Sequence, residues 1–189
     1  MKWNISDRYR NEATVTIFEG DCVEFLKQIP VGSAKLIVTS PPYNIGKSYE
    51  KRTTLQAYLA SQRQTLELAV QILSSGGSLC WQVGNHVDAG EVFPLDVLLY
   101  PICVDLGLKL RNRIVWHFEH GLHCSRRFSG RHETILWFTK SDKYTFNLDP
   151  IRVPQKISRE ASLQRAATGR VHLQPAWEKP RRSLDYSER

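Results

Sequence analysis

Four consecutive residues, Ser40, Pro41, Pro42 and Tyr43, carry the groups that are best placed for chemistry in this sequence. They follow the aliphatic run 36–38, whose composition predicts a short strand buried on both faces of a sheet. The two prolines end that strand, because they remove two backbone donors and fix two φ angles. We therefore expect a rigid loop with a hydroxyl group, free carbonyl groups and an aromatic ring. It would lie at the strand end where open α/β sheets bind ligands.

These groups suit the methylation of an exocyclic amine on a nucleic-acid base. Hydrogen-bond acceptors turn the lone pair of such an amine toward a methyl donor, and Ser40 Oγ and the Pro41 carbonyl can accept in this way. A base in a duplex must first leave the stack, and the ring of Tyr43 can hold its face. The alternative is a structural Pro-Pro turn in which Tyr43 packs into the core, because short motifs also match by chance.

Strands and helices alternate along the chain, and they must position this loop. Apolar and β-branched runs predict strands over residues 13–18, 78–83, 109–118, 133–139 and 144–146. Apolar residues at helical spacing predict helices over residues 23–28, 53–74 and 93–106, the second stopped by Gly76-Gly77 and the third kinked at Pro101. This alternation favours a doubly wound α/β domain.

The string TSPPYNIGKSY around the loop resembles the [D/N/S]-P-P-[Y/F/W] catalytic loop of S-adenosylmethionine-dependent DNA amino-methyltransferases. It is most similar to the β-class, in which this loop precedes the cofactor glycine motif. The segments EGDCVEFLKQIP, KLRNRIVW and SRRFSGRHETILWFTKSDKYTFNLDPIRVPQK also match in family order, so the resemblance covers residues 18–156. It implies an α/β, Rossmann-like methyltransferase sheet with helices on both faces. The sheet would be incomplete, because no Phe-x-Gly-x-Gly cofactor motif occurs in this chain.

The resemblance also implies an activity of restriction–modification type. The reaction would move a methyl group from S-adenosylmethionine to a flipped base of double-stranded DNA. The favoured target is N4 of cytosine, and N6 of adenine is the second choice. Ser40 is the reason, because serine in the first loop position is more frequent among cytosine-N4 enzymes. A cognate restriction endonuclease encoded nearby is the expected partner. Cytosine-C5 chemistry is disfavoured, because none of the cysteines follows a proline.

Within that resemblance, Ser40 to Tyr43 are assigned to catalysis, and Asp21 and Thr39 to cofactor binding. The residue matching Asp21 lies near the adenosyl group in the family. Asp is also a preferred helix N-cap, and the two roles can coexist. The alternative for the whole chain is an inactive, truncated remnant that at most binds DNA.

The stretch 119–131 is rich in basic and turn residues, and the whole chain has a formal net charge of +7. We expect Lys47, Arg126, Arg127 and Arg131 to bind DNA through phosphates, which position a duplex without reading its sequence. A solvated basic loop is the alternative. Four residues nearby have a spacing that could bind zinc: His117, His120, His123 and Cys124. A turn is expected in this stretch and no second cluster completes the ligand set, so we expect no metal site.

Composition places the chain among globular proteins of one domain, with 189 residues of which 41% are hydrophobic. The four cysteines are widely spaced without a CxxC pair, which indicates reduced thiols and a cytoplasmic protein. No signal peptide or run of eighteen apolar residues is present, so membrane insertion is not expected.

Three regions are expected: an N-terminal arm or edge segment over 1–13, the methyltransferase part over 14–156, and a basic tail over 157–189. The tail has no sustained apolar period. Back-translation with one adenine deleted near Lys156 can give NPLGKNPGEVW, which is similar to a segment of the β-class. The tail is therefore predicted to be read in a shifted frame and poorly ordered, which would leave this chain inactive or nearly so. The gene sequence tests this.

Overall fold

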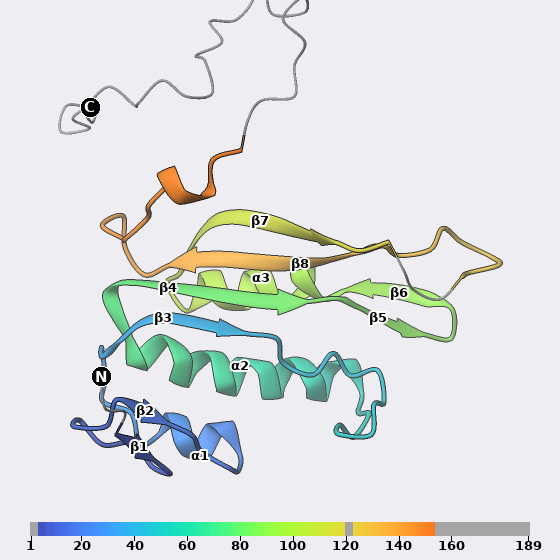
Figure 1. The fold of residues 1–189 in the computed structure, drawn as a ribbon. Coiled ribbons are helices and arrows are strands. Elements are labelled where there is room, and N and C mark those ends of the chain that lie inside the picture. The colour runs from blue at the N-terminus through green and yellow to red at the C-terminus, as the bar shows by residue number, and fades with distance from the viewer. Residues whose placement is uncertain (1–3, 120–122, 154–189) are drawn as a thin grey trace, which may run out of the picture. The chain divides into compact units, whose positions relative to one another are not determined.

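The computed structural model describes residues 4–119 and 123–153, and its centre is a four-stranded mixed sheet (Figure 1). The strands are β3 (Ala34–Thr39), β4 (Leu73–Val83), β8 (His132–Thr139) and β7 (Lys109–His117), in the spatial order β3-β4-β8-β7. β3 runs parallel to β4, and β8 runs antiparallel to both β4 and β7. The predicted strands before and after the basic loop are therefore hydrogen-bonded neighbours.

Two helices, α2 (Leu55–Ile72) and α3 (Leu95–Asp105), pack against one face of this sheet. Their buried side chains join those of Leu79, Trp81 and Phe138 in a single apolar cluster. In Figure 1, α3 lies behind β4 and β8, and α2 lies below β3. The predicted second layer of helices is not found on the opposite face among residues 4–119 and 123–153.

β3 does not have the predicted burial on both faces. Leu36 is 60% exposed and Val38 is 70% exposed, whereas Ile37 packs against the core. Side chains alternate along a strand, so only one face of β3 meets the helical layer. The prediction was wrong because an aliphatic run does not reveal whether both faces are covered.

The pair Gly76-Gly77 does not stop α2, which ends at Ile72 and passes directly into β4. Both glycines lie inside β4, where the pairing with β3 shifts register. A Cβ at Gly76 would lie 2.9 Å from the carbonyl oxygen of Lys143, and a Cβ at Gly77 would lie 2.7 Å from Leu73 Cδ1. The close approach of other segments of the same chain, and not helix termination, explains why glycine occupies these two positions.

A hairpin of β5 (Asn85–Asp88) and β6 (Glu91–Pro94) occupies the stretch before α3. Ala89 and Gly90 form its two-residue turn, both with positive φ. The predicted helix therefore begins two residues late, after Pro94, and it continues through Pro101. Arg52 reaches the hairpin from the segment after the Pro-Pro loop, donating to the carbonyl of Val87 over 3.1 Å and to Asp88 over 2.7 Å.

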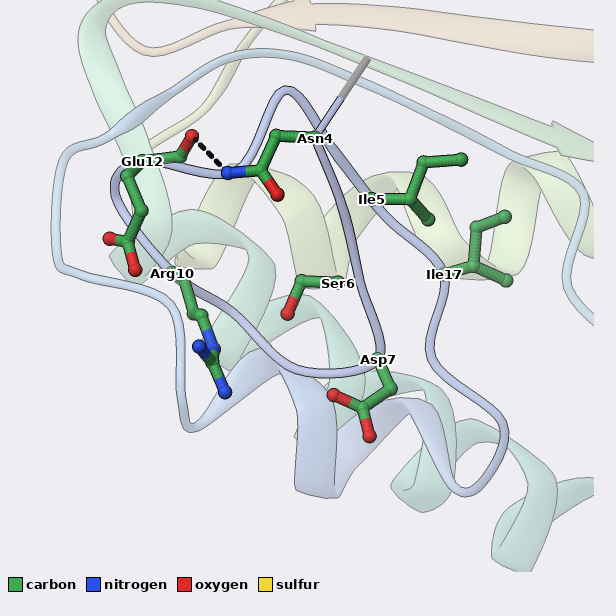
Figure 2. Close-up of a pocket in the computed structure, with 7 residues that line it drawn as sticks. All are labelled: Asn4, Ile5, Ser6, Asp7, Arg10, Glu12 and Ile17. Carbon is green, nitrogen blue, oxygen red and sulfur yellow. Dashed lines mark hydrogen bonds between the residues drawn. The ribbon is translucent and has the colours of Figure 1, made fainter.

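The N-terminal segment is a small parallel pair, β1 (Ile5–Ser6) with β2 (Val15–Thr16), followed by the short helix α1 (Cys22–Leu26). A hollow of about 440 Å³ lies beside this pair. Figure 2 shows the residues that line it, among which Asn4 Nδ2 donates to the carbonyl of Glu12 over 3.1 Å. The hollow is lined by none of the predicted site residues. β1 thus pairs with β2 apart from the four-stranded sheet, and an N-terminal arm over residues 1–13 stays a prediction.

The predicted strand over 144–146 is absent. Tyr144 instead packs edge-on against Trp137, with ring centroids 5.6 Å apart, and beneath the guanidinium of Arg111 at 4.7 Å. The described residues from 146 onward form a separate unit with a short 3₁₀ helix, η1 (Asp149–Ile151). The predicted frame change falls on 157–189 and lies outside the described residues.

All four cysteines are free. In the described part of the chain, no helix combines the length and apolar character needed to span a membrane.

Candidate active site

The Pro-Pro loop leaves the carboxyl end of β3, as predicted, and one carboxylate shapes the turn after it. Glu50 accepts backbone N–H bonds from Asn44, Ile45 and Lys47 over 2.9, 2.8 and 3.3 Å. Burial raises the pKa of this carboxyl, but the backbone N–H bonds outweigh burial and hold the pKa below its ordinary value. Glu50 therefore fixes the turn at residues 44–47.

Asn44 fixes the loop from the other side. It has a left-handed backbone (φ 60°) and a side chain that is only 3% exposed. Its amide donates to the carbonyl of Thr53 over 2.8 Å and accepts from the Thr53 N–H over 2.7 Å. Both ends of the segment 44–53 are thus tied together, which keeps the preceding Pro-Pro pair in place.

Tyr43 lies at the centre of a hydrogen-bonded group. Its hydroxyl is 2.8 Å from Ser40 Oγ and donates to Glu133 Oε2 over 3.2 Å. Gln82 Nε2 donates to the same carboxylate oxygen over 2.6 Å. Burial raises the pKa of Tyr43, the bond with Ser40 lowers it, and the Glu133 carboxylate raises it further, so that the net shift is upward.

Glu133, Gln82 and Gly84 were missed by the sequence reasoning. A Cβ at Gly84 would lie 3.2 Å from two ring atoms of Tyr43, so the glycine lets the ring pack against the end of β4. Pairing of Val83 with Thr134 brings Glu133 beside the same end. The signal in the sequence was a lone carboxylate at the start of a strand. Its position became informative only once β8 was known to run antiparallel to β4.

A cavity of about 680 Å³ lies on one side of the loop. Its lining includes the two predicted cofactor residues, Asp21 and Thr39, and three catalytic candidates, Ser40, Pro41 and Pro42. Asp21 is also the N-cap of α1, accepting from the Val23 N–H over 2.7 Å. The N-cap role of Asp21 is therefore confirmed, and the cofactor role stays a prediction that its position permits.

Three buried polar atoms of this cavity's lining residues have no hydrogen-bond partner: Tyr58 Oη, Gln62 Oε1 and Trp81 Nε1. These residues are 6%, 7% and 2% exposed. Buried polar groups normally have partners. The set contains a hydroxyl, an acceptor and a donor, so it fits a ligand with both acceptors and donors. S-adenosylmethionine, with an adenine and an amino-acid end, has both.

A second cavity of about 470 Å³ lies along the same loop, lined by Ser40, Pro41, Pro42, Tyr43, Tyr49 and Glu133. Three of these residues, Ser40, Pro41 and Pro42, also line the first cavity. The loop thus borders two cavities, one lined by Asp21 and Thr39 and the other lined by Tyr43 and Glu133.

The basic candidates lie outside both cavities. Lys47, Arg126 and Arg127 are exposed, whereas Arg131 is half-buried and donates to the carbonyl of Glu119 over 3.0 Å. This arrangement fits phosphate contacts and a solvated loop equally. Of the four potential zinc ligands, His120 lies outside the described residues, and no group of three His, Cys, Asp or Glu is gathered elsewhere in the described ranges.

Comparisons with known proteins extend this picture. A DNA methylase family model of the N6/N4 type matches residues 34–188, through the stretch where a frame change is expected. The type II methyltransferase M.BglII of Bacillus subtilis is 46% identical over 165 residues, which cover 87% of this chain and 46% of that protein. M.HpaI of Haemophilus parainfluenzae is 34% identical over 152 residues, covering 78% and 46%. The chain spans about half the length of these relatives.

Solved structures agree on the fold. The cytosine-N4-specific PvuII DNA methyltransferase superposes with a TM-score of 0.63 at 17% identity, covering 82% of this chain and 62% of that one. TTHA0409 of Thermus thermophilus, solved with S-adenosyl-L-methionine, gives a TM-score of 0.55 at 28% identity, covering 71% and 58%. The expectation of an incomplete Rossmann-like methyltransferase sheet is confirmed, as is S-adenosylmethionine as the cofactor of the family. By the family match and the identity to M.BglII, the chain belongs to the DNA methylase family of N6 and N4 methyltransferases.

Proposed function

We propose that this chain carries the catalytic loop of a site-specific DNA methyltransferase that acts on an exocyclic base amine, with N4 of cytosine favoured over N6 of adenine. The observation that carries the proposal is that Ser40, Pro41 and Pro42 line both cavities. A methyl donor in the cavity of Asp21 and a base in the cavity of Tyr43 would then meet at the loop.

S-adenosylmethionine supplies an electrophilic methyl group on a sulfonium when it is bound. Asp21, Thr39, Tyr58, Gln62 and Trp81 are the residues that would hold it, since all line the larger cavity. In the transfer, the amine nitrogen would take the methyl group, the cofactor would leave as a neutral thioether with the electron pair of the broken carbon–sulfur bond, and one amine proton would pass to solvent water.

The chain's own contribution is orientation of the amine. Ser40 Oγ and the Pro41 carbonyl would accept its two N–H groups, which directs the nitrogen lone pair toward the donor. The target base leaves the duplex stack to reach them, and Tyr43 lines the cavity that would receive it. Lys47, Arg126, Arg127 and Arg131 would hold the duplex through its phosphates.

We also propose a cytoplasmic location, in keeping with the four free cysteines, and a cognate restriction endonuclease encoded nearby as partner. The preference for cytosine rests on Ser40 in the first loop position. PvuII methyltransferase is cytosine-N4-specific, but its 17% identity bears on the fold alone.

The test is methylation of unmethylated plasmid DNA with methyl-labelled S-adenosylmethionine, followed by digestion to nucleosides. The proposed function predicts labelled N4-methyl-2′-deoxycytidine from the wild type and roughly tenfold less from Ser40→Ala, which lacks one of the two acceptors. Labelled N6-methyl-2′-deoxyadenosine alone would reject the cytosine preference and retain the assignment as an amino-methyltransferase.

The second candidate is an inactive remnant that at most binds DNA. It is favoured by the absence of a Phe-x-Gly-x-Gly sequence in the 189 residues. Binding to DNA without methyl transfer and without cofactor binding would support this second candidate.

A further inference from the structure

The hydrogen-bonded group around Tyr43 joins three elements that are distant in sequence. Ser40 belongs to the loop after β3, Gln82 to β4 and Glu133 to β8. The order of contacts is Ser40 Oγ to Tyr43 Oη at 2.8 Å, Tyr43 Oη to Glu133 Oε2 at 3.2 Å, and Glu133 Oε2 to Gln82 Nε2 at 2.6 Å. These contacts form an unbranched chain in which the carboxylate accepts from both sides.

Counting the protons in this chain fixes its direction. A tyrosine hydroxyl has one proton to donate, and an ionised carboxylate only accepts. The Tyr43 proton is therefore used in the bond to Glu133. Since Tyr43 Oη has no second proton, the bond to Ser40 must be donated by the serine hydroxyl. The single proton of Ser40 then points at Tyr43, and only lone pairs of Ser40 Oγ remain for other partners.

We propose that Glu133 is a positioning residue that acts through Tyr43 to keep Ser40 Oγ an acceptor toward the target amine. This proposal rests on the proposed function. A free serine hydroxyl rotates and can donate as well as accept. A donated bond would engage the amine lone pair that must attack the methyl group. The carboxylate removes that unproductive orientation, and hydrogen bonds in such a chain also strengthen one another.

The packing of Tyr43 keeps this chain in one geometry. The ring lies against Gly84, where a Cβ would be only 3.2 Å away, and it packs against the apolar core. Gln82 holds the carboxylate from β4, and both Gln82 and Glu133 are half-buried. Gln82 and Glu133 lie on paired strands, so the sheet fixes the position of the carboxylate to which Tyr43 donates.

The first test is independent of methyl transfer. Tyrosinate absorbance is followed against pH in the wild type and in Tyr43→Phe, and the difference between them isolates the Tyr43 titration. Because the Glu133 carboxylate raises the pKa of Tyr43, Glu133→Gln should lower the pKa of this tyrosine. Glu91→Gln, the same change at an exposed strand carboxylate, should leave it unmoved. An unmoved Tyr43 titration in Glu133→Gln would overturn the proposal.

The second test uses methylation kinetics on plasmid DNA. Glu133→Gln should lower kcat by roughly tenfold, the loss of about one charge-assisted hydrogen bond, with little change in KM for DNA. In a Ser40→Ala background the same substitution should cause no further loss, because Glu133 acts through Ser40. Full kcat in Glu133→Gln would also overturn the proposal. A wild type that transfers no methyl group would refute the proposed function, and the titration alone would then decide on the hydrogen-bonded chain.

Discussion

At the residue scale, the position of Tyr43 is compatible with both roles that the sequence had left as alternatives. Its ring packs against Gly84 and the core, as a structural residue would, and it also lines a cavity together with Ser40 and Glu133. Asp21 shows the same combination of an N-cap bond and a place in a cavity wall. A residue at the border of a core and a cavity contacts both, so a structural contact is no argument against a functional role.

Removal of the Tyr43 side chain should therefore cost both turnover and stability. Stacking of a ring on an extruded base contributes about 1–3 kcal/mol, so Tyr43→Ala should reduce methylation of plasmid DNA by roughly tenfold or more. Tyr43→Phe keeps the ring and should retain the folded-state stability, measured by urea unfolding, while it loses the hydroxyl bonds. Near-wild-type methylation by Tyr43→Ala would remove the tyrosine from the site.

The Glu50 carboxylate gives the loop a pH dependence with a defined sign. Its pKa in the folded chain lies below the ordinary value of 4.5, because folding favours the ionised form. Its contribution is therefore complete above that value and is lost as the pH falls through the folded pKa. Glu50→Gln should lower the free energy of unfolding by roughly 1–2 kcal/mol at pH 7, since bonds to a charged acceptor are replaced by neutral ones.

The measurement is the difference in unfolding free energy between wild type and Glu50→Gln from pH 7 down to pH values of about 3. The difference should shrink with falling pH. Glu67→Gln, at an exposed helix position, is the control and should show a much smaller difference. A difference that stays constant with pH would show that the carboxylate charge is not what holds residues 44–47.

At the element scale, local pattern located most of the strands and helices, but it did not show which of them lie side by side. Helical spacing located α2, and β-branched runs located β3, β7 and β8 within a few residues. The hairpin of β5 and β6 was missed because its turn, Ala89-Gly90, lacks the usual Asn-Gly or Asp-Gly signal. Exposure of Leu36 and the contact of Glu133 with Tyr43 depend on which elements lie side by side, and a single sequence does not contain that information.

The two glycines of β4 should respond to substitution as packing sites. A Cβ at Gly77 would lie 2.7 Å from Leu73 Cδ1 and 3.0 Å from the carbonyl oxygen of Ala34, and the backbone oxygen cannot move aside freely. Gly77→Ala should therefore lower the unfolding free energy by about 1–3 kcal/mol. Gly130→Ala is the matched control, because no atom lies within 4 Å of its Cβ position. Its effect should stay within about 0.5 kcal/mol. Equal urea midpoints for the two variants would contradict the close packing inferred at Gly77.

The basic loop between β7 and β8 should contribute to DNA affinity without sequence preference. Arg126 and Arg127 are exposed, and each phosphate contact releases counterions from the duplex. The Arg126→Ala, Arg127→Ala double variant should weaken binding to unrelated duplexes alike. It should also lower the slope of log affinity against log salt by about two. An unchanged slope, measured by fluorescence anisotropy, would leave the solvated loop as the better interpretation.

At the scale of the whole molecule, the described fold provides a loop with two cavities but covers only one face of its sheet. The chain spans about half the length of M.BglII, and the larger cavity contains buried polar atoms without partners. The proposed activity of this chain therefore requires that these residues bind the cofactor, and such binding can be measured without any catalysis.

Cofactor binding should appear as a thermal shift. A ligand that binds only the folded state adds about 2.7 kcal/mol at a hundredfold excess over its Kd, which corresponds to roughly 5–10 °C in Tm for a domain of this size. The proposed function predicts such a shift with S-adenosylmethionine in the wild type, whereas an inactive remnant, as the predicted frame change would give, should show none. The variant Tyr58→Phe tests whether the thermal shift comes from ligand bound in the larger cavity or from unspecific stabilisation. It removes a buried hydroxyl that has no partner, so Tm without ligand should be unchanged or higher. The shift with S-adenosylmethionine should be smaller than in the wild type if that hydroxyl meets the ligand. A lower Tm without ligand, together with an undiminished shift, would place the cofactor away from Tyr58.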